Sequence, residues 1–537
     1  MTSELLKLAS VASLSPSPRR DGTNKLGFFP CCFLPTLVLC ESCPQIIRKQ
    51  HTMRHLWIKW IAIQVWLIMA DGVRMLPTKA PLFYNNPFVV LWNAPTEQCR
   101  LRYNVDLHLD VFDIISNVNE TLSGSSVTIF YHTHLGYYPH FSGDGDPING
   151  GIPQNENLTR HLTKAKADIN QIIPVRKFRG LAVIDWENWR PQWDRNWGHK
   201  RIYRNKSLEL VRKRHPHWSE DKIRRAAKNE FENSGKKFMN STLRLAEHMR
   251  SNGLWGYYLY PDCYNYDYKD NPANYTGECP AIETSRNDEL LWLWKESTAL
   301  YPSIYLDSLL KSSPNALKFV RYRVKEALRI ASIARKDYTL PVFVYSRPFY
   351  AYTFDLLTEE DLENTIGESA AQGAAGVVLW GSIKYASSRD SCTVVKDYID
   401  GALGHYILNV TSAAKLCSKV LCKKNGRCIR KTGKPNAYLY LPSDSFKMSL
   451  NASRRKMLVS GRLKKEDEKN MRQRFRCQCY KGWMGDFCEL PVFQKGGKYI
   501  ADKSKTDLFP YSKFYDQNLV ETWYSSQASA KIQKTMY

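Results

Sequence analysis

Two carboxylates separated by one residue stand at the end of an apolar run. Asp185 and Glu187 follow residues 181–184, whose Leu-Ala-Val-Ile sequence favours a β-strand. In a strand, residues i and i+2 point to the same face, and the two acids would lie about 6–7 Å apart along it. The nearby aromatic residues are Trp186, Trp189 and Trp193. Paired carboxylates in an aromatic pocket are typical of glycosidic bond cleavage. The alternative is a strand end whose acids pair with Arg190 or Arg195.

The segments that would position these acids alternate between strand and helix. Apolar runs of strand type occupy residues 88–95, 126–131, 181–184, 254–261, 301–305, 340–345 and 376–381. Helical spacing occupies residues 158–172, 206–250, 289–299, 315–335 and 358–372. This alternation predicts parallel strands in an α/β barrel. Polar and aromatic residues follow the apolar runs, at the barrel end that carries active sites.

Composition and cysteine content narrow the partners and the compartment. The 537 residues carry a net charge of +25, which favours an acidic glycan, a nucleic acid or an anionic membrane as partner. Aromatic residues make up 12%, which suits a cleft that stacks on sugars. Ten of the fourteen cysteines lie from Cys99 onward, and this even number predicts disulfides in an oxidising compartment. The spacing of His and Cys fits no zinc site, so we expect no metal.

Glycosylation motifs agree with passage through the secretory pathway. Seven Asn-x-Ser/Thr acceptors are present, which are Asn119, Asn157, Asn205, Asn240, Asn274, Asn409 and Asn451. Residues 53–72 combine a basic start with an apolar run and are predicted to form a signal peptide. If they stay uncleaved, they would act as a signal-anchor. Residues 1–52 are interpreted as an upstream extension, expected to be disordered, and we expect no GPI signal at the end of the chain.

A second module is predicted at residues 413–491. Its six cysteines, spaced as in an EGF-like module, would staple a unit too small for its own core. Residues 429–476 form a long insert that is rich in Lys and Arg from residue 454 onward. We expect this insert to be a solvated charged loop, and the alternative is an auxiliary polyanion contact. Residues 492–537 are expected to form a disordered tail.

Several motifs together resemble one enzyme family. They are Asp185-Trp-Glu-x-Trp-Arg-Pro191, Trp92-Asn-Ala-Pro-Thr96, Gly150-Gly-Ile-Pro-Gln-Asn155, Leu254-Trp-Gly-Tyr-Tyr258, Pro261-Asp-Cys-Tyr-Asn-Tyr266, Gly367-Glu-Ser-Ala-Ala-Gln-Gly373 and Gly376-Val-Val-Leu-Trp380. The chain resembles hyaluronidases of glycoside hydrolase family 56 from about residue 81 to residue 491. Within that family it is most similar to the sperm-associated and hyaluronidase-4-like vertebrate members.

The resemblance implies a distorted (β/α) TIM-like barrel over residues 81–412 with a small C-terminal EGF-like module. It also implies five disulfides, namely Cys99–Cys392, Cys263–Cys279, Cys417–Cys428, Cys422–Cys477 and Cys479–Cys488. In the implied retaining reaction, Glu187 is the general acid and then the base. Asp185 orients the substrate's acetamido group, and Tyr258 hydrogen-bonds that group. The residues expected to line the substrate groove are Tyr131, Arg190, Tyr266, Tyr305, Tyr350 and Trp380.

The spacing of the two acids supports this division of roles. Two carboxylates on one face of one strand cannot easily sit on opposite faces of a sugar ring, as an ordinary retaining pair does. Something other than a second carboxylate should therefore be the nucleophile, and the family uses the substrate's own acetamido oxygen. We expect burial among the tryptophans and the nearby Asp185 to keep Glu187 protonated. Arg190 would orient the acids or meet a glucuronate carboxylate.

The resemblance implies an endo-β-N-acetylhexosaminidase that cleaves β-1,4 bonds between N-acetylglucosamine and glucuronate. Hyaluronan is the expected substrate, with chondroitin as a second candidate, and no cofactor is required. The alternative function is a catalytically weak hyaluronan-binding or gamete-surface adhesion protein. We expect a secreted or cell-surface monomer, with a sperm or acrosomal location as one case. Membrane association would arise only through an uncleaved N-terminal segment, and nucleic acid is not an expected partner.

Overall fold

The computed structural model describes residues 75–451, 453, 455–495 and 498–501, which belong to one compact unit. The predictions for residues 1–52 and 53–72 lie outside the described residues. None of the helices in the described ranges is long and apolar enough to cross a membrane.

Seven strands with parallel neighbours form the centre of the fold. Four pair in the order β2-β1-β9-β8 and three in the order β3-β6-β7. These strands are β1 (Val89–Asn93), β2 (Ile115–Ser116), β3 (Val127–Tyr131), β6 (Leu181–Asp185), β7 (Leu254–Tyr257), β8 (Phe343–Ser346) and β9 (Gly376–Trp380). Most of their residues are buried, as expected for Val-, Ile- and Leu-rich strands covered on both faces. The predicted α/β barrel is confirmed.

The two sheets meet through irregular pairing on both sides of the barrel. On one side, residues 300–303 bridge to the ends of β7 and β8 through the pairs Tyr258–Tyr301, Leu300–Val342 and Ser303–Tyr345. On the other side, the buried Asn117 follows β2 and contacts the start of β3. Its amide donates to the Val127 and Thr121 carbonyls at 2.7 and 2.8 Å, and its oxygen accepts from the backbone of Ser126 and Val127. Hydrogen bonds from the Asn117 side chain thus take the place of strand pairing between β2 and β3. The barrel is distorted at this point.

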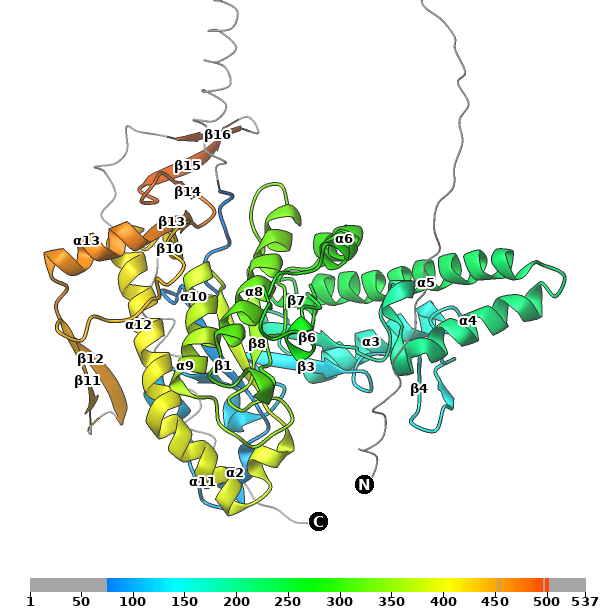
Figure 1. Ribbon diagram of the computed structural model, residues 1–537, viewed down its shortest axis with the longest axis horizontal. Coiled ribbons are helices and arrows are strands. Elements are labelled where there is room, and N and C mark those ends of the chain that lie inside the picture. The colour runs from blue at the N-terminus through cyan, green and yellow to red at the C-terminus, as the bar shows by residue number, and fades with distance from the viewer. Residues whose placement is uncertain (1–74, 452, 454, 496–497, 502–537) are drawn as a thin grey trace, which may run out of the picture. The chain divides into compact units, whose positions relative to one another are not determined.

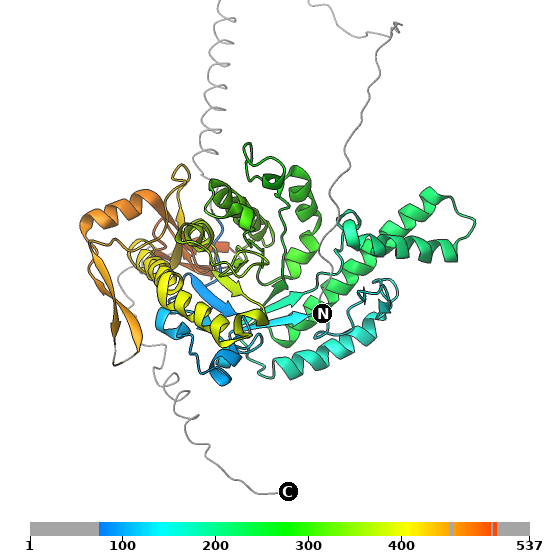
Figure 2. The ribbon, with the colours of Figure 1, turned by 60° about the horizontal axis from the view of Figure 1, so that its bottom comes forward.

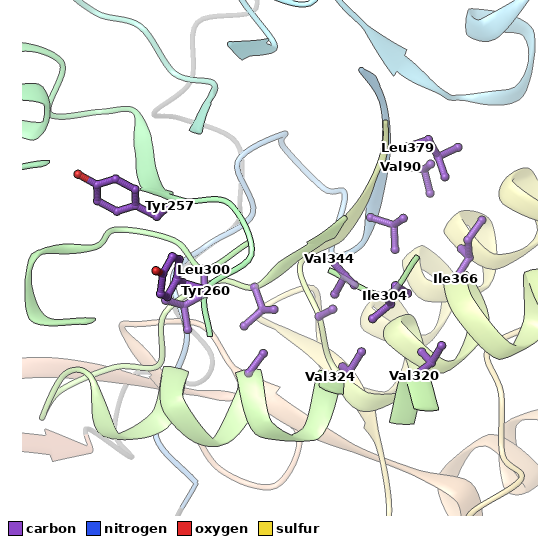
Figure 3. Close-up of a cluster of buried hydrophobic side chains, with 14 of the residues drawn as sticks. Val90, Tyr257, Tyr260, Leu300, Ile304, Val320, Val324, Val344, Ile366 and Leu379 are labelled. Atoms are coloured by element: carbon purple, nitrogen blue, oxygen red, sulfur yellow. The ribbon is translucent and has the colours of Figure 1, made fainter. Parts of the chain in front are cut away.

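Helices surround the strands (Figures 1 and 2). They are α2 (Glu97–Leu101), α3 (Leu158–Ile172), α4 (Arg201–Arg214), α5 (Glu220–Met249), α6 (Ala281–Glu289), α7 (Leu291–Glu296), α8 (Pro314–Ile333), α9 (Glu359–Leu362), α10 (Glu368–Gln372), α11 (Arg389–Tyr398), α12 (Gly404–Leu421) and α13 (Lys465–Arg474). Helix α8 begins at a Ser313 cap followed by Pro314, which favours a helix start. Its Val320 and Val324 lie near Val344 of β8 in the buried apolar layer (Figure 3).

The C-terminal module is built on two antiparallel strands and on the end of α12. Strand β10 (Gly426–Arg430) pairs with β13 (Phe475–Cys479). Three disulfides staple this module and two tie the barrel, and they are the five pairs that the resemblance implies: Cys99–Cys392, Cys263–Cys279, Cys417–Cys428, Cys422–Cys477 and Cys479–Cys488.

The insert at residues 429–476 is not the solvated loop that its charge predicts. It contains the hairpin β11 (Phe446–Asn451) and β12 (Lys456–Gly461), followed by α13. Alternate hairpin residues, among them Met448 and Met457, face the core, while the charged residues face solvent. The apolar alternation within the basic stretch is what allows it to fold.

The module and the barrel share structural elements. Helix α12 (Gly404–Leu421) runs continuously across residue 413, where the boundary between barrel and module is predicted. The position of that boundary stays a prediction. The Glu368 carboxylate of α10 is fully buried and accepts from both Arg321 of α8 and Arg430 of β10. Because a buried charge requires such partners, this cluster holds the module against the barrel.

Two short antiparallel strands lie where the disordered tail was predicted to begin. Strand β15 (Leu490–Lys495) pairs with β14 (Trp483–Met484) and with β16 (Lys498–Ala501). The prediction of disorder from residue 492 is therefore wrong at its start, because backbone pairing extends past the last disulfide. Residues 502–537 lie outside the described residues. The remaining paired strands are β4 (His140–Phe141) and β5 (Pro147–Ile148).

We predict that Asn117→Ala lowers the free energy of unfolding by about 2–4 kcal/mol, because it leaves buried backbone groups between β2 and β3 without partners. Urea denaturation followed by circular dichroism measures this change. Asn233→Ala, at an exposed position of α5, is the control and should change stability by less than about 0.5 kcal/mol. Equal losses in the two variants would contradict the closing role of Asn117.

Candidate active site

The predicted site residues gather at the carboxyl ends of the parallel strands. Tyr131, Asp185 and Trp380 are the last residues of β3, β6 and β9. Tyr258 directly follows β7, and Tyr305 follows the bridging segment 300–303. Tyr131 and Asp185 are register partners across the β3–β6 pair. The parallel register therefore delivers residues from five separate parts of the chain to one end of the barrel.

The two acids occupy different environments. Asp185 is half-buried as a whole residue, but its Oδ1 is enclosed and has no hydrogen-bond partner among the described residues. Burial is the main reason that the pKa of Asp185 is raised to about 8, while Glu187 raises it further and Arg190 lowers it. The Glu187 side chain is 51% exposed. The pair thus takes up one proton near neutral pH, with one carboxyl facing solvent and the other enclosed.

The tryptophans do not form the pocket that the sequence predicts. Trp186, Trp189 and Trp193 are 3%, 2% and 4% exposed and belong to the main core. Trp186 packs on Tyr138 and Phe238, with ring centroids 4.7 and 5.7 Å apart. The expectation that they bury Glu187 is therefore wrong, because all three side chains pack into the core while the Glu187 side chain is 51% exposed. The three tryptophans belong to the core beneath the segment that carries the two acids.

Two cations hold the backbone at Glu187. The Arg190 guanidinium donates to the Glu187 carbonyl at 3.0 Å, and its Nη2 lies 3.7 Å from the Glu187 carboxylate. The Lys200 ammonium donates to the same carbonyl at 2.6 Å, and burial followed by the Arg190 charge lowers the pKa of Lys200 to about 8. Arg190 is buried, which supports the first of its two predicted roles, orienting the acids. Arg195 does not pair with the acids but binds Asp262 and Glu283.

The aromatic side chains beside the acids contact one another. The Trp380 indole donates to the Tyr131 hydroxyl at 3.1 Å, and the Trp380 ring stacks on Tyr305 at 6.1 Å with a 20° tilt. The Tyr258 hydroxyl lies 3.3 Å from Ser303 Oγ. Burial and the Glu187 charge raise the pKa of Tyr258, and burial raises that of Tyr131 to about 12. Both hydroxyls therefore stay neutral and can donate hydrogen bonds at physiological pH.

The structure contradicts the prediction that Tyr350 lines a groove. Its side chain is completely buried, and its hydroxyl donates to the Asp361 carboxylate. Tyr266 is half-buried on the loop after β7, where its ring packs on the exposed Tyr264 at 4.7 Å. Tyr264 also meets Trp197, which is 50% exposed, at 5.4 Å. Tyr266 thus stays a candidate groove residue, whereas Tyr350 is a core residue.

Sequence reasoning did not assign a role to several residues of this site. The Tyr345 hydroxyl of β8 lies 3.4 Å from Asn93 Oδ1 at the end of β1, and Ser303 binds Tyr258. Arg347, just after β8, lies over the Tyr305 and Trp380 rings at 5.6 and 5.2 Å. Tyr345 is the last residue of a predicted strand, so taking the ends of predicted strands would have identified it. Asn93, Ser303 and Arg347 lie within or beyond the predicted runs and would not have been found in that way.

The seven glycosylation candidates differ in accessibility. Asn119, Asn157, Asn205 and Asn274 are exposed, whereas Asn240, Asn409 and Asn451 are partly buried. Asn157 caps α3 and Asn409 accepts from the Leu441 backbone, so both amide oxygens already have structural roles. Their modification stays a prediction. Within the described ranges there is no cluster of three His, Cys, Asp or Glu residues that could hold a metal ion.

Comparisons with known proteins place this site among characterised relatives. Residues 77–492 match the family model Glyco_hydro_56, described as "Hyaluronidase". A hyaluronidase of Crotalus adamanteus is 61% identical over 439 residues, covering 81% of this chain and 98% of that protein. Hyaluronidase-4 of Cerastes cerastes is 60% identical with the same coverage. The crystal structure of bee venom hyaluronidase in complex with a hyaluronic acid tetramer has a TM-score of 0.55 and 34% identity, covering 60% of this chain and 98% of that one.

The raised pKa of Asp185 predicts a pH-dependent stability. From its ordinary value of 3.8 up to about 8, the folded chain retains a proton that the unfolded chain releases, so stability falls as pH rises through this window. Asp185→Asn removes this dependence. Relative to the wild type, its free energy of unfolding should rise between pH 4 and 8, by at most about 1.4 kcal/mol per pH unit. Urea denaturation across pH measures this, and a constant difference would contradict the buried proton.

Proposed function

The chain belongs to the hyaluronidases of glycoside hydrolase family 56, and from this premise we propose that it hydrolyses internal β-1,4 bonds between N-acetylglucosamine and glucuronate in hyaluronan. The observation that carries the proposal is the placement of an enclosed Asp185 carboxyl, whose raised pKa of about 8 favours a retained proton, beside a half-exposed Glu187 at the end of β6. A binding protein requires no such proton. The bee venom hyaluronidase, whose structure is a complex with a hyaluronic acid tetramer, supports the same substrate class.

In the first step, the proton that Asp185 holds passes through Glu187 to the glycosidic oxygen as the C1–O bond breaks. The Glu187 carboxyl is the one that a substrate can reach, because its side chain is 51% exposed. The acetamido oxygen of the same N-acetylglucosamine forms the new bond to C1 from the opposite face. The proton of the pair is then consumed, and Asp185, as a carboxylate, accepts a hydrogen bond from the acetamido N–H and offsets its positive charge.

In the second step, Glu187 takes a proton from water as the water oxygen attacks C1. The bond from the acetamido oxygen to C1 breaks, and the original anomeric configuration is restored by two inversions. The proton returns to the pair, so the enzyme ends the cycle as it began. The close placement of the acids at the end of β6 favours this route, because two neighbouring carboxyls would lie on one side of the sugar ring and leave the far face to another nucleophile.

The aromatic residues would hold the reacting sugar. Trp380 and Tyr305 present stacked apolar rings beside the acids, which suit the C–H face of the ring and the acetamido methyl. Tyr258, neutral and next to Ser303, would donate to the acetamido oxygen. Tyr131 and Tyr266 are proposed to contact neighbouring sugars. The excess of positive charge favours an anionic polymer generally, so we propose chondroitin as a second substrate.

Other predicted properties stay proposals. The five disulfides support an oxidising compartment and hence secretion. The snake relatives support the family rather than the sperm-associated subgroup. We propose that the protein acts as a monomer outside the cell.

We predict that Glu187→Gln lowers hyaluronan cleavage at least about a thousandfold, because general acid-base catalysis of both steps is lost. Size-exclusion chromatography with mass spectrometry of the products measures chain length across pH. Binding of hyaluronan should be retained, since the variant is isosteric. If the wild-type protein binds hyaluronan but never shortens it, the enzyme proposal fails and the binding or adhesion alternative stands.

We predict that Tyr258→Phe lowers kcat about a hundredfold with a smaller effect on KM, as for loss of one hydrogen-bond donor to a developing charge. The matched control is Tyr264→Phe, whose partly exposed ring lies on the loop after β7. De-N-acetylated positions of the polymer should resist cleavage by every variant, because they lack the nucleophile. Cleavage at such positions would contradict the acetamido mechanism.

A further inference from the structure

A cavity lies at the opposite end of the barrel from Asp185 and Glu187. It has a volume of about 260 Å³ and is lined by the first residues of three strands, Val89 of β1, Leu254 of β7 and Phe343 of β8. The active-site residues are the last residues of these or neighbouring strands, or lie just after them. The cavity is therefore separate from the proposed catalytic site and has no part in the mechanism above.

The charged residues that line this cavity are all positive. They are Lys79, Arg179 and Arg427, and the lining within the described chain includes no Asp or Glu. Ser251 and Asn252 add polar groups, while Leu82 and Phe83 belong to the apolar part of the wall. A pocket with apolar walls and several cations strengthens the attraction for an anion, because the local dielectric constant is low.

Arg427 is the unusual member of this group. It is 4% exposed, its Nη1 donates to the Gly373 carbonyl at 2.9 Å, and its Nε has no hydrogen-bond partner among the described residues. Burial lowers the pKa of Arg427, although the nearby Tyr480 hydroxyl opposes this. Arg430, on the same strand, binds the Glu368 carboxylate instead. A buried guanidinium without an anionic partner is costly, so this position favours an anion from outside the chain.

The surroundings of Lys79 reinforce the positive potential. Burial and the neighbouring Arg335 and Lys481 lower the pKa of Lys79. Two acids, Glu247 and Asp337, raise it in part. Asp337 is already engaged, however, because it accepts from Lys481 at 2.7 Å. The field at the cavity therefore stays positive.

We propose that this cavity binds a sulfate-type oxoanion, held by Arg427 with Arg179 and Lys79 at its sides. The guanidinium fork suits the paired oxygens of such an anion. The volume holds one anion with several waters, given about 30 Å³ per water molecule, and a polymer would enter only by one group. The anion would come either from inorganic sulfate or from a sulfate ester of a glycan. Because Arg427 belongs to the module and Arg179 to the barrel, the bound anion would join the two.

The test is the thermal stability of the full chain against sodium sulfate, with sodium chloride at matched ionic strength. Sulfate also stabilises proteins nonspecifically by exclusion from their surface, and that effect grows without saturation. We expect a saturable rise in Tm for the wild type, as ligand linkage requires. Arg179→Ala should weaken the apparent affinity about threefold to tenfold. Arg176→Ala, an exposed cation on the same loop that does not line the cavity, should bind as the wild type does.

A second variant and a second ligand complete the experiment. Arg427→Lys keeps the charge but loses the fork, and it should weaken the saturable component more than Arg179→Ala does. Adding a sulfated monosaccharide distinguishes the sources, because displacement of sulfate at similar concentration indicates a glycan ester and no displacement indicates the inorganic ion. A nonsaturable rise, or equal affinity in all variants, overturns the proposal. Since none of these residues lies at the acids, the result does not depend on the proposed hydrolysis.

Discussion

The parallel register of β3, β6 and β7 is the constraint on which the rest of the site depends. It fixes Tyr131 opposite Asp185 and places Tyr258 one residue beyond the next strand. The Asp185 carboxyl is enclosed because the strand that carries it is buried, and this enclosure raises its pKa. Glu187, two residues further along, has left the strand and reaches solvent. One strand end thus creates two chemically different carboxyls from two similar residues.

Much of the barrel was predictable because its strands are short apolar runs. Residues 181–184 and 376–381 appear as β6 and β9 with shifts of one residue at most. The acids, Tyr258 and Trp380 were accessible through their motifs and their places after strands. By contrast, Asn117 closes the barrel through a side chain, and no periodic pattern signals such a contact. A role of this kind depends on the three-dimensional path of the chain.

The incorrect predictions have a common physical cause. The tryptophans near Glu187 were assigned to the pocket because they are close in sequence, and Tyr350 was assigned to the groove from the family resemblance, but all of them are core residues. Aromatic side chains favour either environment, and only the direction of each Cβ decides between them. The charged insert was assigned to solvent for a similar reason. Its hairpin folds because alternate residues are apolar, a pattern that the surrounding Lys and Arg residues obscure in the sequence.

Helix α12 is shared by the barrel and the C-terminal module. Domains are commonly joined by exposed linkers, and these allow whole domains to be exchanged between proteins during evolution. Here the predicted boundary lies inside a helix, and the Glu368 carboxylate of the barrel accepts from Arg430 of the module. Recombination at this point would cut the helix and leave a buried carboxylate with fewer cations. The small module and the barrel are therefore expected to depend on one another for their stability.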